Sequence, residues 1–278
     1  MLLRGILVAL SGFLFIFAPG VPMGMLRRYG RGFPREHLYW GMGIWLVALI
    51  PTYFLQSLVR QAVQGAGSTA VTAAGQPSTA ILSLVTPLFA ALLLVGGMAL
   101  YLRRKRLPED ERTEAGLTLG FGAGLIAQVF RGLEFVGGGL RLAYGGAGDP
   151  GLTPLAQSPM LDLIVALLAE ILFRIAFLTV SGVVGILVAR AVSGSPRSFW
   201  LAAAVYAAFS WVMVATQLVM GGENPGATLA GQASLITSAV TAIYYILAAA
   251  LAYLWLQRRL TAEAPAAPVR GKRGRRAG

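Results

Sequence analysis

The sequence contains no cysteine, and His37 is its only histidine. These absences exclude disulfides, thiolate catalysis, zinc fingers and iron–sulfur clusters, since all of them depend on these side chains. Charge is also scarce, because Asp, Glu, Lys and Arg make up 12% of the 278 residues. Soluble domains usually carry about 25% charged residues. The chain therefore has too little charge to cover the surface of a soluble core.

Apolar residues are correspondingly abundant. They make up 56% of the sequence, and the mean hydropathy is +0.70. This composition is typical of an integral membrane protein and excludes both an ordinary soluble enzyme and a disordered chain. We expect a multi-pass protein of the cytoplasmic membrane.

Seven apolar runs are long enough to cross a hydrocarbon core of ~30 Å, which takes about 20 helical residues. They are Gly5–Met25, Leu38–Leu58, Ala80–Leu102, Ala115–Leu140, Met160–Ala191, Phe199–Met220 and Leu235–Leu256. Glycine, proline and charge gather between them, where helices end. The sequence predicts an all-α bundle of seven transmembrane helices over residues 1–257. A disordered basic cytoplasmic tail is predicted over residues 258–278.

The placement of the 23 basic residues predicts the orientation. Alternate loops and the tail hold 18 of them, the opposite side holds three, and Arg131 and Arg174 lie inside runs. Basic residues concentrate on the cytoplasmic side, so we expect the N-terminus outside and the C-terminus inside. No folded basic module accompanies this charge, so nucleic acid is not an expected partner.

Four charged residues inside the runs are the candidate functional residues. Arg131 and Glu134 are three residues apart, and Glu170 and Arg174 are four apart, so each pair shares one helix face. Counted from the inner ends of their long runs, all four lie toward the outer side. The sequence predicts a neutral cluster that pairs Arg131 with Glu170 and Glu134 with Arg174. Such groups are costly in a membrane unless paired, so they form either a salt-bridged connection between helices or a site facing a water-filled cavity.

Glycines mark a second feature. Gly116, Gly120 and Gly124 recur every four residues, which predicts a flat face for a neighbouring helix. The block Gly137–Gly139 is expected to mark the fraying outer end of that helix. No histidine lies at the depth of the serines within runs to activate them, so we expect most of them to bond to a backbone carbonyl or across helices. They are Ser11, Ser83, Ser181 and Ser210.

Aromatic residues near the ends of runs are typical of anchors at the membrane surface. They are Trp40, Tyr101, Trp200 and Trp255. His37 is expected in a cytoplasmic loop beside Arg35 and Glu36, as an interfacial side chain rather than a ligand. No metal ligands or cofactor motif are apparent, and none is expected.

The succession of sequence blocks resembles a known family. A third run ending in "YLRRKR", a glycine-rich fourth with "LGFGAGLIAQVF", a fifth ending in "VVGILVARAV" and a sixth opening with "FWLAAAVYAAFSW" are similar to the YhfC family of seven-helix bacterial membrane proteins. That family is regarded as related to the glutamic intramembrane proteases of the CAAX-processing type. The resemblance implies a seven-helix fold and, for active members, hydrolysis of peptide bonds within the membrane.

The motifs that the resemblance implies for catalysis are incomplete. The block "AEILFR" keeps Glu170 and Arg174 but has Ala169 in place of the first glutamate of the family motif. Where the family shows a glycine-histidine-glycine block and a glutamate, this chain has Leu125 and Gln128 nearby. Where later histidines are expected, the matching positions are Ser181 and Tyr206. Without an intramembrane histidine, the usual water-activating site cannot be assembled.

Three functions remain open on the sequence. We expect a non-catalytic or diverged relative of that family, whose partners are the lipid bilayer and either a membrane protein, a peptide or a lipid. The alternative is an active glutamic-type intramembrane peptidase that uses Glu170 and Arg174. The third is a transporter component built on the same charged cluster.

Overall fold

The structure is a computed structural model that describes residues 2–18, 20–27, 33–65, 77–145, 159–219 and 235–262. Helices are the only regular elements in these ranges. They are α1 (Leu2–Phe17), α2 (Gly20–Arg27), α3 (Arg35–Gly65), α4 (Pro77–Lys105), α5 (Glu109–Ala143), α7 (Met160–Val192), α8 (Pro196–Val219) and α9 (Leu235–Ala262). The prediction of an all-α fold is confirmed for this part of the chain.

Within the described ranges, six helical segments are long and apolar enough to cross a membrane. They are Leu2–Gly24, Arg35–Leu55, Val85–Lys105, Glu111–Ala143, Met160–Val192 and Ala239–Leu260. Each of them coincides with one of the predicted apolar runs. The run Phe199–Met220 forms α8, which is not among the six; the side chains of α8 are described only over residues 196–211.

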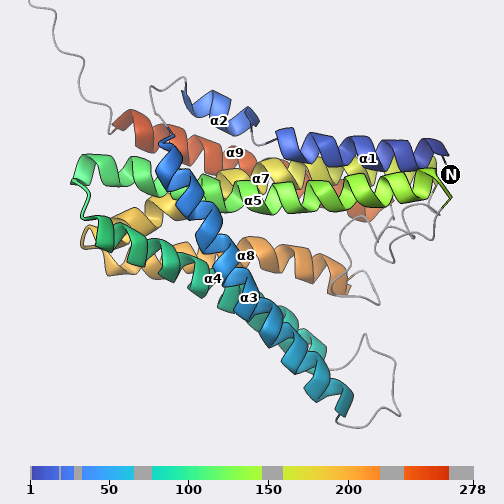
Figure 1. Ribbon diagram of the computed structural model, residues 1–278, viewed down its shortest axis with the longest axis horizontal. Coiled ribbons are helices and arrows are strands. Elements are labelled where there is room, and N and C mark those ends of the chain that lie inside the picture. The colour runs from blue at the N-terminus through green and yellow to red at the C-terminus, as the bar shows by residue number, and fades with distance from the viewer. Residues whose placement is uncertain are drawn as a thin grey trace, which may run out of the picture.

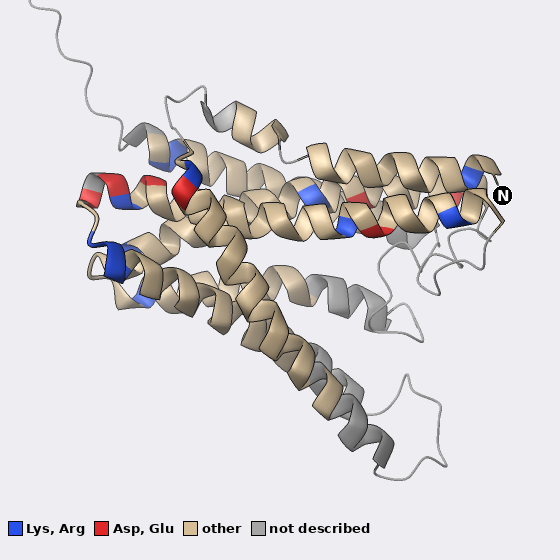
Figure 2. Cartoon of the chain, in the orientation of Figure 1, with Lys and Arg blue, Asp and Glu red and all other residues tan. Residues whose placement is uncertain are grey.

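Two groups of helices diverge in the structure. Helices α1, α5 and α7 lie along the long axis of the molecule, whereas α3 and α4 descend obliquely from one end (Figure 1). Lysine and arginine gather at that end, where α4 finishes with Arg103, Arg104 and Lys105 (Figure 2). A smaller set of charges lies within the long helices, and it belongs to the candidate site.

Helices α5 and α7 pack against each other without intervening side chains. A Cβ atom added at Gly120 would overlap the carbonyl oxygen of Ser181, and one added at Gly185 would overlap that of Gly116. Gly124 lies against Leu178. Residue numbers fall on α7 as they rise on α5, so the two helices are antiparallel. The predicted glycine packing face is confirmed.

The second half of α5 packs in the same way against α1. A Cβ atom at Gly12 would overlap the backbone at Gly132, and one at Gly139 would overlap Ala9. Gly139 therefore lies within a tight helix contact, and α5 continues to Ala143. The expectation that Gly137–Gly139 mark a fraying helix end is wrong, because α1 covers this segment of α5.

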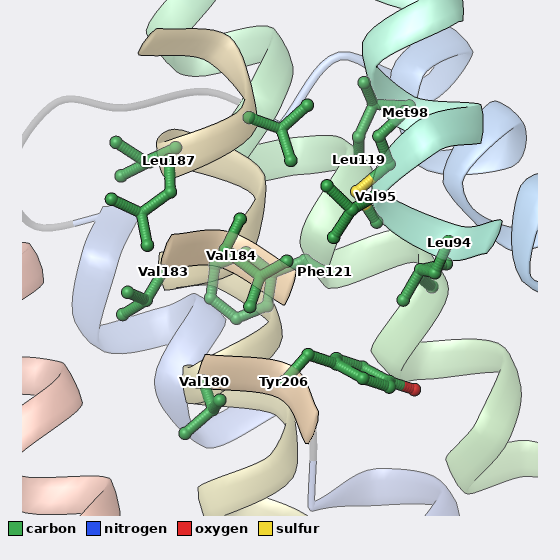
Figure 3. Close-up of a cluster of buried hydrophobic side chains, with 14 of the residues drawn as sticks. Leu94, Val95, Met98, Leu119, Phe121, Val180, Val183, Val184, Leu187 and Tyr206 are labelled. Atoms are coloured by element: carbon green, nitrogen blue, oxygen red, sulfur yellow. The ribbon is translucent and has the colours of Figure 1, made fainter. Parts of the chain in front are cut away.

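The main hydrophobic core lies among α4, α5, α7, α8 and α9. Figure 3 shows its middle, where side chains of α4 and α5 meet Val180, Val184 and Leu187 of α7 and Tyr206 of α8. A smaller core lies among α1, α5 and α7 and includes Phe15, Phe135 and Leu163. The charged cluster of the candidate site lies on α5 and α7, where the first core gives way to the second.

Several local predictions have clear outcomes. Ser11 donates to the Val8 carbonyl at 2.7 Å and Ser210 to the Tyr206 carbonyl at 3.1 Å, as expected for serines within helices. Ser181 is buried, and its Oγ has no hydrogen-bond partner among the described residues. The side chain of Ser83 lies outside the described residues.

His37 lies in the first turn of α3 rather than in a loop, so that expectation is wrong. Its Nδ1 atom is 2.8 Å from the Tyr101 hydroxyl, and the two rings are in contact. Tyr101 is 8% exposed, since α3 covers it. It therefore packs between helices rather than anchoring the surface, whereas Trp40 and Trp200 are exposed as anchors would be.

Helix α9 extends further than the predicted boundary after Gln257. It runs to Ala262, so Arg258 and Arg259 belong to the helix and not to the tail. The rest of the predicted tail, residues 263–278, lies outside the described residues.

Candidate functional site

Four charged side chains meet where α5 passes α7. Arg131 pairs with Glu134 on its own helix and with Glu170 across the interface, where the Nε and Oε1 atoms are 3.8 Å apart. Arg174 pairs with Glu170, four residues before it on α7. Two positive and two negative groups are thus connected through shared partners, and their formal charges sum to zero.

The pairing differs in part from the one predicted from the sequence. The expected contact of Arg131 with Glu170 is present, whereas Glu134 and Arg174 do not pair with each other among the described residues. Arg174 instead reaches back by one helical turn, which is the distance that a spacing of four residues provides. Both guanidinium groups consequently converge on one carboxylate, Glu170.

Exposure falls steadily from one end of the cluster to the other. The Glu134 side chain is 57% exposed, Arg131 is 21% exposed and Arg174 is 9% exposed. Glu170 is 1% exposed. Burying an unpaired carboxylate would be very costly, so the two guanidinium groups compensate the burial of Glu170.

Aromatic rings cover the two arginines. The Arg174 Cζ atom is 4.6 Å from the centre of the Phe173 ring and 5.7 Å from that of Phe15. Arg131 lies over Phe135, 4.7 Å from the ring centre. Because the Phe15 and Phe135 rings also contact each other, α1 closes the cluster from one side. The faces of these rings carry partial negative charge and attract the guanidinium groups.

Two uncharged polar residues lie beside the ion pairs. Gln128 of α5 donates from Nε2 to the Arg174 carbonyl at 3.2 Å, and the Tyr245 ring of α9 is 5.0 Å from the Phe173 ring. Both side chains are fully buried. Four polar atoms in and beside the cluster have no hydrogen-bond partner among the described residues, namely Gln128 Oε1, Tyr245 Oη, Arg174 Nε and Arg131 Nε.

Sequence reasoning missed Tyr245. A signal was available, because this tyrosine lies in the middle of the run Leu235–Leu256. Tyrosines that anchor a helix at the membrane surface lie near the ends of spans. A tyrosine at mid-span needs a polar partner for its hydroxyl, and it therefore points to a polar site within the bundle.

The other positions implied by the family resemblance do not join the cluster. The Ser181 backbone packs against Gly120, and the Tyr206 ring lies 5.8 Å from that of Phe177 in the main core. Ala169 is fully buried beside Glu170 and offers no polar atom. No three His, Cys, Asp or Glu side chains lie together as metal ligands within the described ranges.

Over the described residues, the fold and the site thus define an all-helical chain with six helical segments able to cross a membrane, and with a buried ion-pair cluster between two of them. Comparison of the chain with protein-family models, with curated proteins and with solved structures found no match.

Proposed function

We propose that the protein is a seven-span protein of the bacterial cytoplasmic membrane, with its N-terminus outside and its C-terminus inside. Six spans correspond to the apolar helices described above, and α8, with 24 residues, supplies the seventh. The gathering of basic residues at one end of the bundle supports the orientation (Figure 2).

Reporter fusions test this topology. A reporter placed after residue 278 should be active only in the cytoplasm, and one placed after Gly221 should be active only outside. A C-terminal reporter that is active only outside would require a different number of spans.

We propose further that the protein is non-catalytic and acts by binding a membrane protein or a lipid. The observation that supports this proposal is the state of the Glu170 carboxylate, which is 1% exposed and ion-paired to both Arg131 and Arg174. A glutamate that acts as a general base must accept a proton from water. Both guanidinium groups contact one oxygen of this carboxylate, Oε1, so Glu170 already serves as an ion-pair partner between α5 and α7.

The two alternative functions have less support. A peptidase needs a second group that orients the attacking water beside Glu170, and Ala169 occupies the position of the family's other glutamate. Transporter sites form where broken helices meet in the middle of the membrane. Helices α5 and α7 carry the cluster, and both run unbroken through it.

The relation to YhfC-type proteins stays a proposal that rests on the succession of sequence blocks. It is compatible with a non-catalytic function, because the chain keeps Glu170 and Arg174 while its histidine positions are Ser181 and Tyr206.

Cleavage assays on reconstituted protein test the non-catalytic function. Wild-type protein and the Glu170→Gln variant should both leave a set of single-span reporter helices uncut. Cleavage by the wild-type protein that is lost in a folded Glu170→Gln variant would establish the peptidase alternative instead.

A further inference from the structure

The unpartnered polar atoms beside Arg174 come from three different helices. Gln128 Oε1 is on α5, Arg174 Nε is on α7 and Tyr245 Oη is on α9. Gln128 bonds to the Arg174 backbone, and Phe173 links the other two residues, because its ring contacts both the Arg174 guanidinium and the Tyr245 ring. Buried polar groups almost always have hydrogen-bond partners. Three unpartnered atoms on residues linked in this way therefore point to a common ligand.

The chemistry of these atoms restricts that ligand. The guanidinium Nε can only donate a hydrogen bond, the amide oxygen can only accept one, and the tyrosine hydroxyl can do both. The ligand must therefore both accept and donate. It must also be small, because Gln128 and Tyr245 are fully buried and Arg174 is 8% exposed.

The ligand must also be uncharged. Arg131 and Arg174 already balance Glu134 and Glu170, so an added ion would leave one buried charge without a counterion. A small, neutral molecule that both donates and accepts hydrogen bonds is water. A buried water molecule typically makes about three hydrogen bonds, which is the number that these atoms offer.

We infer that Gln128, Arg174 and Tyr245 form an internal water site between α5, α7 and α9. The exposed Glu134 and the partly exposed Arg131 give this site a polar connection to the outer surface of α5. Water can thus reach the buried ion pair along charged groups. This site does not depend on the proposed binding function.

Radiolytic hydroxyl-radical labelling, read by mass spectrometry, tests the site in wild-type protein reconstituted in lipid nanodiscs. Radicals form from water, so a buried side chain is labelled when a water molecule lies beside it. Tyr245 should be labelled several-fold faster than Tyr206, although Tyr206 is 9% exposed and Tyr245 is fully buried. Labelling of Tyr245 at or below the rate of Tyr206 would overturn the inference.

A pair of variants locates the ligands of the water. Gln128→Leu keeps a similar volume but removes the amide oxygen, and it should lower the labelling of Tyr245 several-fold. Thr179→Val is the matched control, because the Thr179 hydroxyl is also buried but already donates to the Ile175 carbonyl at 2.7 Å. It should leave Tyr245 labelling unchanged. Unchanged labelling in a folded Gln128→Leu variant would contradict the site, and if that variant does not fold, the comparison of Tyr245 with Tyr206 decides.

Discussion

The two halves of α5 contact the same neighbour, α7, by different means. In the first half, Gly116 and Gly120 allow the two backbones to touch, and the contact involves no charged side chain among the described residues. In the second half, Arg131 reaches Glu170 and Gln128 reaches the Arg174 backbone. The comparison teaches that the first contact depends on shape, whereas the second depends on keeping charges paired.

The largest effect is expected where a charge would be left alone. Glu170→Gln removes the carboxylate that serves both Arg131 and Arg174. Breaking a buried pair in this way costs about 3–5 kcal/mol, and the cost falls toward the lower value if water reaches the site. Thermal unfolding in detergent, compared with wild-type protein, measures the loss. If Glu170→Gln is as stable as the wild-type protein, the second half of α5 does not depend on paired charges.

Glu134→Gln is the matched control, since it is the same chemical change on the same cluster. The Glu134 side chain is 57% exposed, and its removal leaves Arg131 paired with Glu170. Exposed pairs contribute about 0.2–1 kcal/mol, so the loss should be small. If Glu134→Gln lowers the stability as much as Glu170→Gln does, Glu134 must be covered in the membrane by a partner molecule.

An intermediate effect is expected in the first half of α5. Gly120→Ala places a Cβ atom against the Ser181 carbonyl, and the helices must separate to accept it. Overpacking of this kind costs about 1–3 kcal/mol. The unfolding temperature and the elution profile in detergent should both change.

A small effect of opposite sign is expected for Gly137→Ala. No atom lies within 4 Å of a Cβ atom at this position. Alanine is favoured over glycine inside a helix by about 0.5–1 kcal/mol, so this variant should unfold at a slightly higher temperature. If Gly120→Ala and Gly137→Ala behave alike, close backbone contact does not hold the first half together.

Sequence patterns predicted the first half of α5 better than the second. Glycines four residues apart indicate a helix-packing face directly, and Gly116, Gly120 and Gly124 form one. The α1 contact escaped this reasoning because Gly132 and Gly139 are seven residues apart. Seven residues are close to two helical turns, so this spacing also places both glycines on one face.

The charged cluster was predicted in its membership and in the pair of Arg131 with Glu170, whereas the predicted pair of Glu134 with Arg174 was wrong. Spacings of three and four residues place Arg131 with Glu134 and Glu170 with Arg174 on shared faces. Which guanidinium reaches which carboxylate depends on the rotation of α5 against α7 and on the side-chain rotamers. The position of Tyr245 depends on how α9 packs against the other helices. The residue spacing within α5 and α7 carries no information on that packing.

The central claim is that Glu170 stabilises the contact of α5 with α7 and does not activate water. A double-mutant cycle tests it most directly, with Glu170→Gln combined with Arg174→Met and, separately, with Arg131→Met. Because each double variant removes an orphan charge, at least one should be more stable than Glu170→Gln alone. A Glu170→Gln variant as stable as the wild-type protein, together with double variants that gain nothing, would contradict the claim.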